Sequence, residues 1–86
     1  MVVKLKWYPG TGCKKYKVEI YSDGQRVKTV QFGDRRYEQY KDSTPLKLYS
    51  HINHNDKERR RLYKVRHEKD RHTQYTAGWF ADKYLW

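Results

Sequence analysis

The sequence predicts an α+β fold: a small antiparallel sheet in the N-terminal half, packed by one or two helices and an aromatic C-terminal segment. Three patterns support this. Residues 15–32 alternate between apolar and polar side chains around a turn, and residues 56–69 contain neither Gly nor Pro. Five of the last eight residues are large apolar or aromatic ones. Strand patterns precede helix patterns, and the length suits one domain, so we take residues 1–86 as a single domain.

Residues 15–32 are expected to form a β-hairpin. From Tyr16 to Ile20, apolar residues alternate with charged ones, which is the two-residue period of a half-buried strand. Asp23-Gly24 suits a tight hairpin turn, and a second strand follows to Phe32 with one imperfection in its alternation. An isolated hairpin is marginally stable in water. The β-prone residues 2–7 can add a third strand, and the rest of the chain must cover one face.

Two helix starts are expected in the C-terminal half. Thr44-Pro45 has the order of an N-cap followed by proline at the first helical position, which predicts a short helix over residues 46–52, with a strand as the alternative. Asn55 and Glu58 have the spacing of a capping box. This second signal predicts a helix over residues 56–69.

Aromatic side chains must supply much of the core, because only 36% of the residues are hydrophobic. A large ring buries about 150–250 Å², so a few rings close a small core. Leu62 and Tyr63 are expected to seat the predicted helix on the sheet. The residues expected to form the structural aromatic core are Tyr63, Trp79, Phe80 and Trp86.

Positive charge runs through the whole chain. Lys and Arg number 20 against 10 Asp and Glu, for a net charge of +10. Residues 1–43 and residues 44–86 each contain ten basic and five acidic groups, so the excess is not confined to a tail. Like charges at this density repel one another and weaken the compact state. We therefore expect a partner of opposite sign, either a polyanion such as DNA or an acidic protein.

The basic stretch of the predicted helix is the candidate binding surface. Eight basic and three acidic residues lie between Lys57 and Arg71. Successive helical residues fan about 100° apart, so consecutive Arg side chains cover most of the exposed circumference and suit phosphates. The alternative is a solvated face on which Glu58 and Glu68 pair locally. The residues predicted to bind a polyanion or a protein partner are Lys57, Arg59, Arg60, Arg61, Lys64, Arg66 and Arg71.

Signatures of catalysis are missing from the sequence. It has no Gly-rich phosphate loop, nucleophile elbow or spaced acidic pair, so we expect no enzyme activity and no small-molecule substrate. Cys13 is the single cysteine, and no Cys-x-x-Cys pair accompanies the four His, so no metal and no cofactor are predicted. A zinc module or small nuclease is the minor alternative. No apolar run approaches the ~18 residues of a membrane span, so no membrane partner is expected.

Four segments carry a resemblance to a known family: VQFGD at 30–34, YEQYKD at 37–42, HNDKERRRLYKVRH at 54–67 and TAGWFADKYLW at 76–86. In this order, over residues 27–86, they resemble short proteins encoded by large DNA viruses of algae and amoebae, of the giant-virus type. That pattern joins a strand ending in Phe-Gly, a helix of the Asp-x-x-Arg-x-x-Tyr-x-x-Arg-His kind, and a C-terminal Ala-Gly-aromatic…Leu-Trp. The resemblance implies a viral origin, and no catalytic or binding residues carry over from it.

The resemblance and the charge together give two functional hypotheses. The first is a non-enzymatic viral structural protein, a minor capsid or capsid-associated component that bridges coat subunits and contacts packaged DNA. It would be made in the host cytoplasm or nucleus and reside in the virion, with viral coat proteins as partners. The alternative is a nucleic-acid-binding protein that coats or compacts viral DNA through phosphate contacts without reading its sequence.

Overall fold

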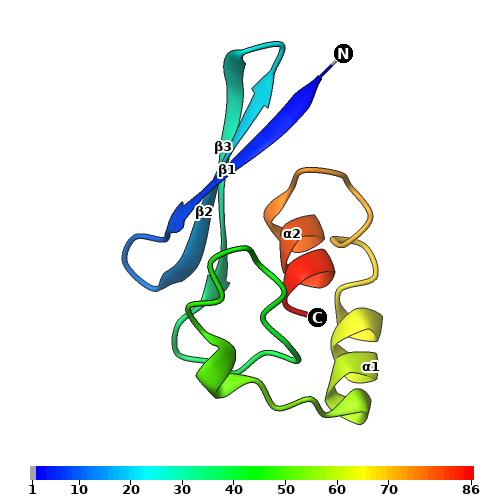
Figure 1. The fold of residues 1–86 in the computed structure, drawn as a ribbon. Coiled ribbons are helices and arrows are strands. Elements are labelled where there is room, and N and C mark those ends of the chain that lie inside the picture. The colour runs from blue at the N-terminus through cyan, green and yellow to red at the C-terminus, as the bar shows by residue number, and fades with distance from the viewer. Residues whose placement is uncertain (1) are drawn as a thin grey trace.

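The computed structural model describes residues 2–86 and confirms the α+β fold class (Figure 1). Its elements, in chain order, are β1 (Val3–Pro9), β2 (Lys14–Ser22), β3 (Gln25–Asp34), the 3-10 turn η1 (Ser50–Ile52), α1 (Lys57–Arg66) and α2 (Ala77–Tyr84). The strands form one antiparallel sheet in the order β1-β2-β3. The predicted hairpin and the third strand are therefore both confirmed.

The hairpin between β2 and β3 closes at Asp23 and Gly24. Their φ angles of 51° and 85° are left-handed, as a primed hairpin turn requires. A carboxylate oxygen of Asp23 also accepts the backbone N–H of Val2 at 3.0 Å, which ties the start of β1 to the turn. The pairing register shifts between Ile20 and Tyr21, and this bulge leaves Val27 of β3 without a partner. The bulge accounts for the imperfect alternation in the sequence.

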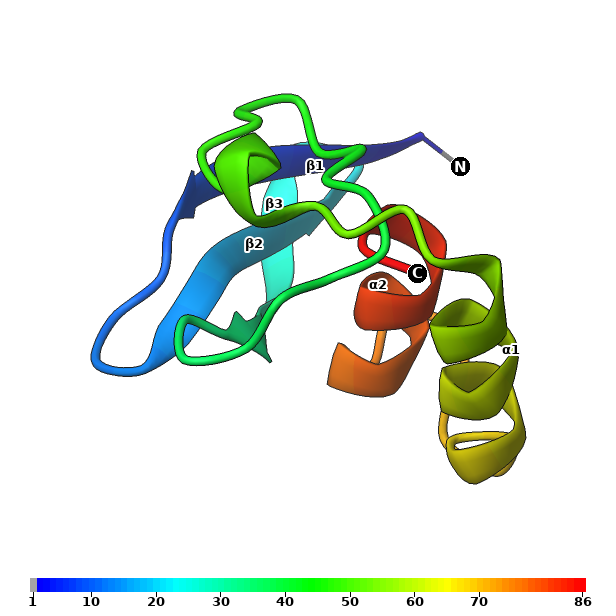
Figure 2. The ribbon, with the colours of Figure 1, turned by 90° about the horizontal axis from the view of Figure 1, so that it is seen from below.

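Both helices lie on one side of the sheet (Figures 1 and 2). α2 packs against β3, and α1 lies outside α2, so the layers run sheet, α2, α1. The tip of the β2–β3 hairpin projects beyond α2 (Figure 1). Within residues 2–86, no helix lies on the other face of the sheet. The buried hydrophobic residues between the sheet and α2 are Tyr16, Val18, Ile20, Val30, Phe32, Phe80, Ala81 and Leu85.

The aromatic C-terminal segment forms α2, a helix that the sequence pattern did not predict. Thr76 caps this helix, since its side-chain oxygen accepts the backbone N–H of Trp79 at 3.3 Å. Phe80 is fully buried and stacks on Phe32 of β3 with ring centroids 5.5 Å apart. The other predicted core aromatics are half-buried and pack against the core; they are Tyr63, Trp79 and Trp86.

Gly78 lies in the first turn of α2, where another segment of backbone passes very close. A Cβ at Gly78 would lie 2.7 Å from the carbonyl oxygen of Asp70. Backbone atoms cannot rotate away, so we predict that Gly78→Ala lowers the free energy of unfolding by about 1–3 kcal/mol, despite the higher helix propensity of Ala. Urea denaturation measures this. The control Ala77→Ser, at an exposed neighbouring position, should stay within about 0.5 kcal/mol; equal effects in both variants would contradict the close approach.

The predicted helix over residues 46–52 is wrong, because only η1 (Ser50–Ile52) is helical there. Lys47 has a left-handed φ of 49°, which interrupts any helix. The Thr44 hydroxyl, expected to cap that helix, donates instead to Asp42 at 2.6 Å, and its oxygen accepts the backbone N–H of Lys47 at 3.2 Å. Local side-chain hydrogen bonds thus replace the helix with a turn.

Buried hydrogen bonds hold the irregular connection between β3 and α1 against the sheet. Asp42 is only 2% exposed, and its carboxylate accepts the hydroxyls of Tyr16 and Thr44 and the backbone N–H groups of Thr44 and Tyr49. Burial raises the pKa of Asp42, but these hydrogen bonds outweigh burial and leave its pKa below the ordinary value. Gln39 is fully buried and donates to the carbonyl oxygen of Tyr49 at 2.7 Å. We call Asp42, Gln39 and their partners the buried polar network.

α1 begins and ends within the predicted range, with a different cap. Asp56 is the N-cap, because its carboxylate accepts the backbone N–H groups of Glu58 and Arg59 at 3.0 and 3.2 Å. Asn55, the predicted cap, has a left-handed φ of 54° and precedes the helix. The helix ends at Arg66, three residues earlier than predicted.

Aromatic stacking fixes α1 to the C-terminal end of the chain. The Tyr63 ring lies parallel to that of Trp86, with centroids 4.2 Å apart and an interplanar angle of 3°, and His67 lies 4.3 Å from Tyr63. Burial, with Asp82 adding to it, raises the pKa of Tyr63 to about 12. Leu62 is 52% exposed, so the prediction that it seats the helix on the sheet is wrong. Tyr63 seats α1 on Trp86 instead.

Candidate polyanion-binding surfaces

Two of the predicted binding residues, Lys64 and Arg71, contact α2. Lys64 Nζ lies 2.7 Å from a carboxylate oxygen of Asp82, and an Arg71 nitrogen lies 3.8 Å from the other. All three side chains are at least partly buried. Arg71 also pairs with Glu68 at 2.8 Å. These two cations therefore hold α1 and the following turn to α2, which reduces their availability to a ligand.

Two more predicted residues pair with carboxylates at the surface. Arg59 lies 2.9 Å from Glu38, and Arg61 lies 2.5 Å from Glu58, three residues away on the same helix. All four side chains are well exposed. Exposed ion pairs contribute little to stability, so phosphates can replace these partners at small cost. The local pairing of Glu58 is the alternative that the sequence left open.

The remaining three predicted residues differ in their surroundings. Arg60 Nε donates to the carbonyl oxygen of Trp86 at 2.7 Å, and its guanidinium lies 5.1 Å from the ring centre of Tyr40. Arg60 thus adds to the docking of α1. Lys57 and Arg66 are exposed and have no ion pair or side-chain hydrogen bond within residues 2–86.

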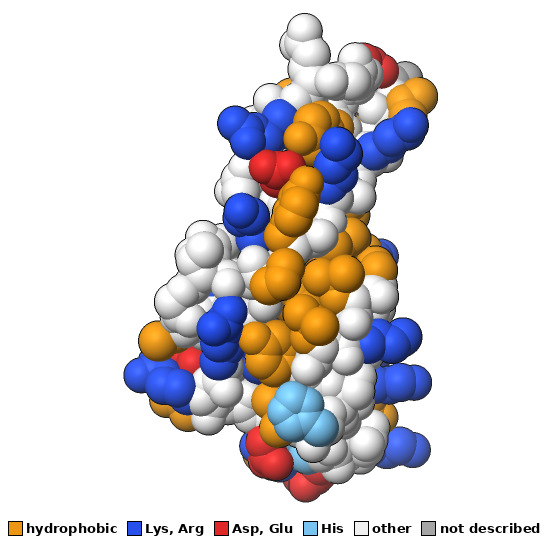
Figure 3. All heavy atoms as spheres, turned by 60° about the vertical axis from the view of Figure 1, so that its left-hand side comes forward, with side chains coloured by type: hydrophobic (Ala, Val, Ile, Leu, Met, Phe, Trp, Pro, Cys, Tyr) orange, Lys and Arg blue, Asp and Glu red, His pale blue; other side chains and the backbone are white. Residues whose placement is uncertain are grey.

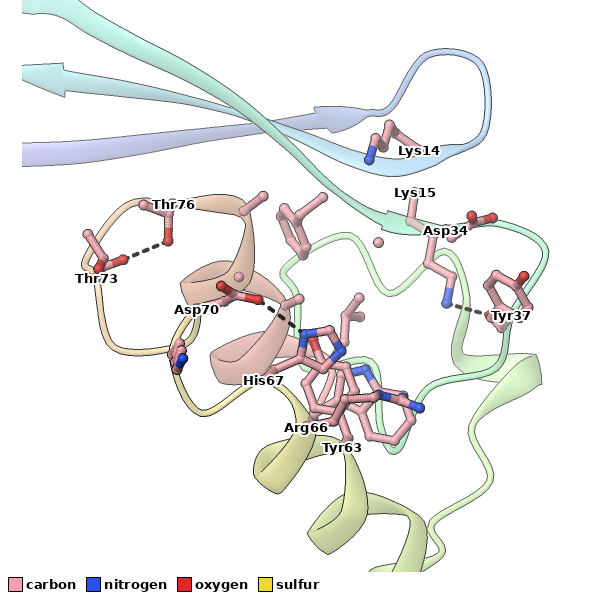
Figure 4. Close-up of a pocket in the computed structure, with 18 of the residues that line it drawn as sticks. Lys14, Lys15, Asp34, Tyr37, Tyr63, Arg66, His67, Asp70, Thr73 and Thr76 are labelled. Atoms are coloured by element: carbon pink, nitrogen blue, oxygen red, sulfur yellow. Dashed lines mark hydrogen bonds and ion pairs between the residues drawn. The ribbon is translucent and has the colours of Figure 1, made fainter.

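A groove of about 730 Å³ opens between the end of β3, the C-terminal end of α1 and α2 (Figure 4). Its floor is apolar and includes Phe32, Ala81, Leu85 and Trp86. Its rim carries charges of both signs: Lys14, Asp34, Glu38, Arg66, Lys69 and Asp70. Because these charges offset one another, the groove offers no single-sign field for phosphates.

Lys15 lies beside this groove, but it belongs to the fold. Its side chain is 2% exposed, and Nζ donates to the carbonyl oxygen of Tyr37 at 2.7 Å (Figure 4). Nζ also donates to the side-chain oxygen of Gln39. Burial lowers the pKa of Lys15 to about 8, although Asp42 and Asp34 act in the opposite direction. A cation so enclosed cannot reach a large ligand.

The face of the sheet turned away from α2 is rich in cations and tyrosines. Side chains alternate along a strand, so every second residue points away from the core. Figure 3 shows this side of the molecule, where hydrophobic side chains form a band with Lys and Arg on both flanks. The register places on this face Lys4, Lys6 and Tyr8 of β1, Lys17, Glu19 and Tyr21 of β2, and Arg26, Thr29 and Gln31 of β3. We call these residues the open sheet face.

Lysine side chains lie over the tyrosine rings of the open sheet face. Lys6 Nζ is 4.8 Å from the ring centre of Tyr21, and Lys17 Nζ is 5.2 Å from that of Tyr8. These separations are typical of cation–π contacts. Neither lysine, nor Lys4, has an ion pair within residues 2–86.

Glu19 is the one acidic residue of the open sheet face, and its carboxylate already accepts hydrogen bonds from neighbouring side chains. Its carboxylate accepts Arg26 at 3.0 Å and the Tyr21 hydroxyl at 3.0 Å. The hydrogen bond from Arg26, followed by that from Tyr21, lowers the pKa of Glu19. The face thus presents four cations against one carboxylate that stays ionised. The polar half of the strand alternation was the signal for this surface, but the binding residues predicted from the sequence lie on and after α1.

All ten carboxylates of the chain have a partner inside the fold. Besides those already described, Asp34 pairs with Arg36 at 2.8 Å, and Asp70 lies 3.5 Å from the His67 ring. Many cations have no such partner. Those without an ion pair or side-chain hydrogen bond in the described chain include Lys4, Lys6, Lys14, Lys17, Lys28, Lys41, Lys47, Lys57, Arg66 and Lys69. The surplus positive charge is therefore left facing solvent.

The cysteine and histidines do not come together. Cys13 is exposed in the β1–β2 turn, and no group of three His, Cys, Asp or Glu side chains within residues 2–86 is placed to hold a metal ion. In the same part of the chain, no helix has the length and apolar character to cross a membrane.

No family model, no curated protein and no solved structure matches this chain.

Proposed function

We propose that this protein is a non-enzymatic nucleic-acid-binding protein that contacts phosphates without reading the base sequence. One observation carries the proposal: every carboxylate is engaged within the fold, while unpaired Lys and Arg side chains remain at the surface. A polyanion supplies the negative charge that the fold itself does not. Its binding would also relieve the repulsion among the unpaired cations.

The distribution of the cations favours backbone contacts over base-specific recognition. They lie on the open sheet face and along α1, on opposite sides of α2. Four of the seven cations predicted to bind pair with carboxylates, and Arg60 donates to a carbonyl oxygen, so few side chains of α1 are left to reach into a groove. Phosphate contacts position a protein on nucleic acid and carry no sequence information directly.

Fluorescence anisotropy with unrelated labelled duplexes and single strands tests this proposal. We expect dissociation constants of about 10⁻⁶ M or tighter at low salt, similar for unrelated sequences. The affinity should fall steeply with salt. In a plot of log affinity against log salt concentration, each duplex phosphate that is contacted should contribute about −0.9 to the slope. An absence of binding at low salt, with a folded protein confirmed by circular dichroism, would contradict the proposal.

A second candidate function is a minor component of a viral particle that bridges coat proteins. The favouring observation is the pair Leu62 and Val65, which are 52% and 65% exposed and three residues apart on the outer helix. Exposed apolar side chains of this kind suit a protein partner. The resemblance of residues 27–86 to a viral family also supports it. Mass spectrometry of purified virions tests this candidate, and absence of the chain from the particles would rule it out.

A further inference from the structure

The open sheet face combines charge with flat rings. Its four cations surround Tyr8 and Tyr21, and its one carboxylate, Glu19, is bonded to Arg26 and Tyr21. Tyr8 is 37% exposed, and Tyr21 is half-buried. A ligand that matches this face carries negative charges and planar groups on one flexible chain.

We infer that the open sheet face binds single-stranded nucleic acid, with bases stacked on Tyr8 and Tyr21. This inference rests on the proposed nucleic-acid binding and adds its site and strand form. The side chains that would contact the phosphates are Lys4, Lys6, Lys17 and Arg26.

The positions of the two rings favour unpaired bases. Tyr8 is opposite Lys17, and Tyr21 is four residues further along β2, so the backbone positions of the two tyrosines lie roughly 13 Å apart along the strands. Each ring can therefore take a separate base. A duplex hides the faces of its bases in the stack, whereas a single strand can splay them onto aromatic side chains of a sheet.

The lysines over the rings suit the same ligand. Lys6 and Lys17 hold their ammonium groups over the rings, about 5 Å from the ring centres, so a base that stacks on a ring displaces the ammonium group toward its neighbouring phosphate. Their long side chains can move aside while the charge stays close. On α1 and the turn after it, by contrast, Lys64 and Arg71 are tied to Asp82.

Tyrosine substitutions test the stacking contacts. Tyr8→Leu and Tyr21→Leu keep apolar bulk and remove the ring. We expect each to weaken binding of a labelled oligothymidylate about tenfold, and to change duplex binding little. The matched control is Tyr37→Leu, which removes a 65% exposed tyrosine, with Arg36 5.7 Å from its ring centre, outside the open sheet face. Thermal denaturation checks that all three variants remain folded.

Lysine substitutions test the phosphate contacts by a different readout. For single-stranded DNA, the double variant Lys6→Gln/Lys17→Gln should make the slope of log affinity against log salt concentration shallower by about 1.4. This is 0.7 for each phosphate that is no longer neutralised. The control Lys41→Gln/Lys47→Gln removes two unpaired cations from the connection between β3 and α1, outside both surfaces, with the same change in net charge. It should leave this slope nearly unchanged.

The outcomes separate the site from the function. If the wild type binds oligothymidylate but both tyrosine variants bind it like Tyr37→Leu, the inference is overturned and nucleic-acid binding lies elsewhere. If inorganic polyphosphate competes as well as oligothymidylate and the tyrosine variants have no effect, the face is a charge site only, which also overturns the inference. If the wild type binds no nucleic acid at low salt, the proposed function fails and the inference fails with it.

Discussion

Replacing Asp42 by Asn is expected to lower the free energy of unfolding by about 3 kcal/mol or more. The Asp42 carboxylate accepts four hydrogen bonds in a site that is 2% exposed. Hydrogen bonds to charged groups contribute about 1.5–3 kcal/mol each, and an amide cannot accept on both sides of its group. The Tyr16 hydroxyl and the Tyr49 N–H share one carboxylate oxygen, and the hydroxyl and N–H of Thr44 share the other, so one of these two pairs of donors would then face the new NH₂ group. A domain with about 5–15 kcal/mol in total would lose much of its stability.

Urea denaturation followed by circular dichroism measures this loss. The matched control is Asp23→Asn, because Asp23 accepts one hydrogen bond in an exposed turn and Asn tolerates its left-handed φ. The control should change stability by less than about 0.5 kcal/mol. Equal stability of Asp42→Asn and Asp23→Asn would show that the buried polar network contributes little.

The same carboxylate gives the wild type an acid-sensitive contribution to stability. The pKa of Asp42 in the folded protein is below its ordinary value, so the folded state binds the proton less readily than the unfolded chain does. This contribution is fully present above about pH 5 and is lost as the pH falls below about 4. The Asp42→Asn variant should therefore show a shallower loss of stability with acid.

Replacing Trp86 by Ala is expected to release α1 while the sheet stays folded. Trp86 stacks on Tyr63, packs 5.1 Å from the His54 ring, and is half-buried. α1 buries no residue of its own, so its position depends on this stack together with the ion pair between Lys64 and Asp82. Loss of a large aromatic side chain costs about 3–5 kcal/mol in a full core, and we expect about 3 kcal/mol here.

Hydrogen exchange locates this effect. Backbone amides of α1 should exchange much faster in Trp86→Ala, while amides of β2 should keep most of their protection, because the main core lies between the sheet and α2. The control Leu62→Ala truncates a 52% exposed side chain on the same helix and should change neither region. Uniform loss of protection in β2 and α1 would mean that the two form one cooperative unit.

The sheet could be predicted from the sequence because the patterns that indicate its strands and turn lie in residues that are neighbours along the chain. The alternation from Tyr16 to Ile20 assigns the buried side, and Asp23-Gly24 suits the turn conformation that the structure shows. Each signal depends on neighbouring residues only. The same holds for the existence of α1, whose length was overestimated because Lys69 has no feature that forbids a helix.

The connection between β3 and α1 could not be predicted, because its contacts are distant in sequence. Thr44 resembled a cap, but the partner of its hydroxyl is a carboxylate that also binds Tyr16, which is 26 residues from Asp42. The packing of α1 also depends on a contact between residues distant in sequence, since Tyr63 and Trp86 are 23 positions apart. Such contacts form only when the whole chain has folded, so no local sequence pattern indicates them.

The candidate site was only partly predictable for a related reason. The excess of positive charge is a property of the composition, but its availability depends on which cations the fold pairs. Lys64 and Lys57 are equivalent in the sequence pattern, yet Lys64 contacts Asp82, while Lys57 remains free within the described residues. The open sheet face was visible only as the polar half of the strand pattern.

A three-stranded sheet leaves two edge strands, β1 and β3, each with unpaired backbone groups that can join a sheet of another molecule. Here both edges carry obstacles to such growth. β1 has Lys4 and Lys6 and ends in Pro9, while β3 has Lys28 next to the bulged Val27. Charges, proline and bulges all discourage edge-to-edge pairing. Many copies could therefore be crowded along one polyanion and remain separate folded units instead of assembling into amyloid-like fibres.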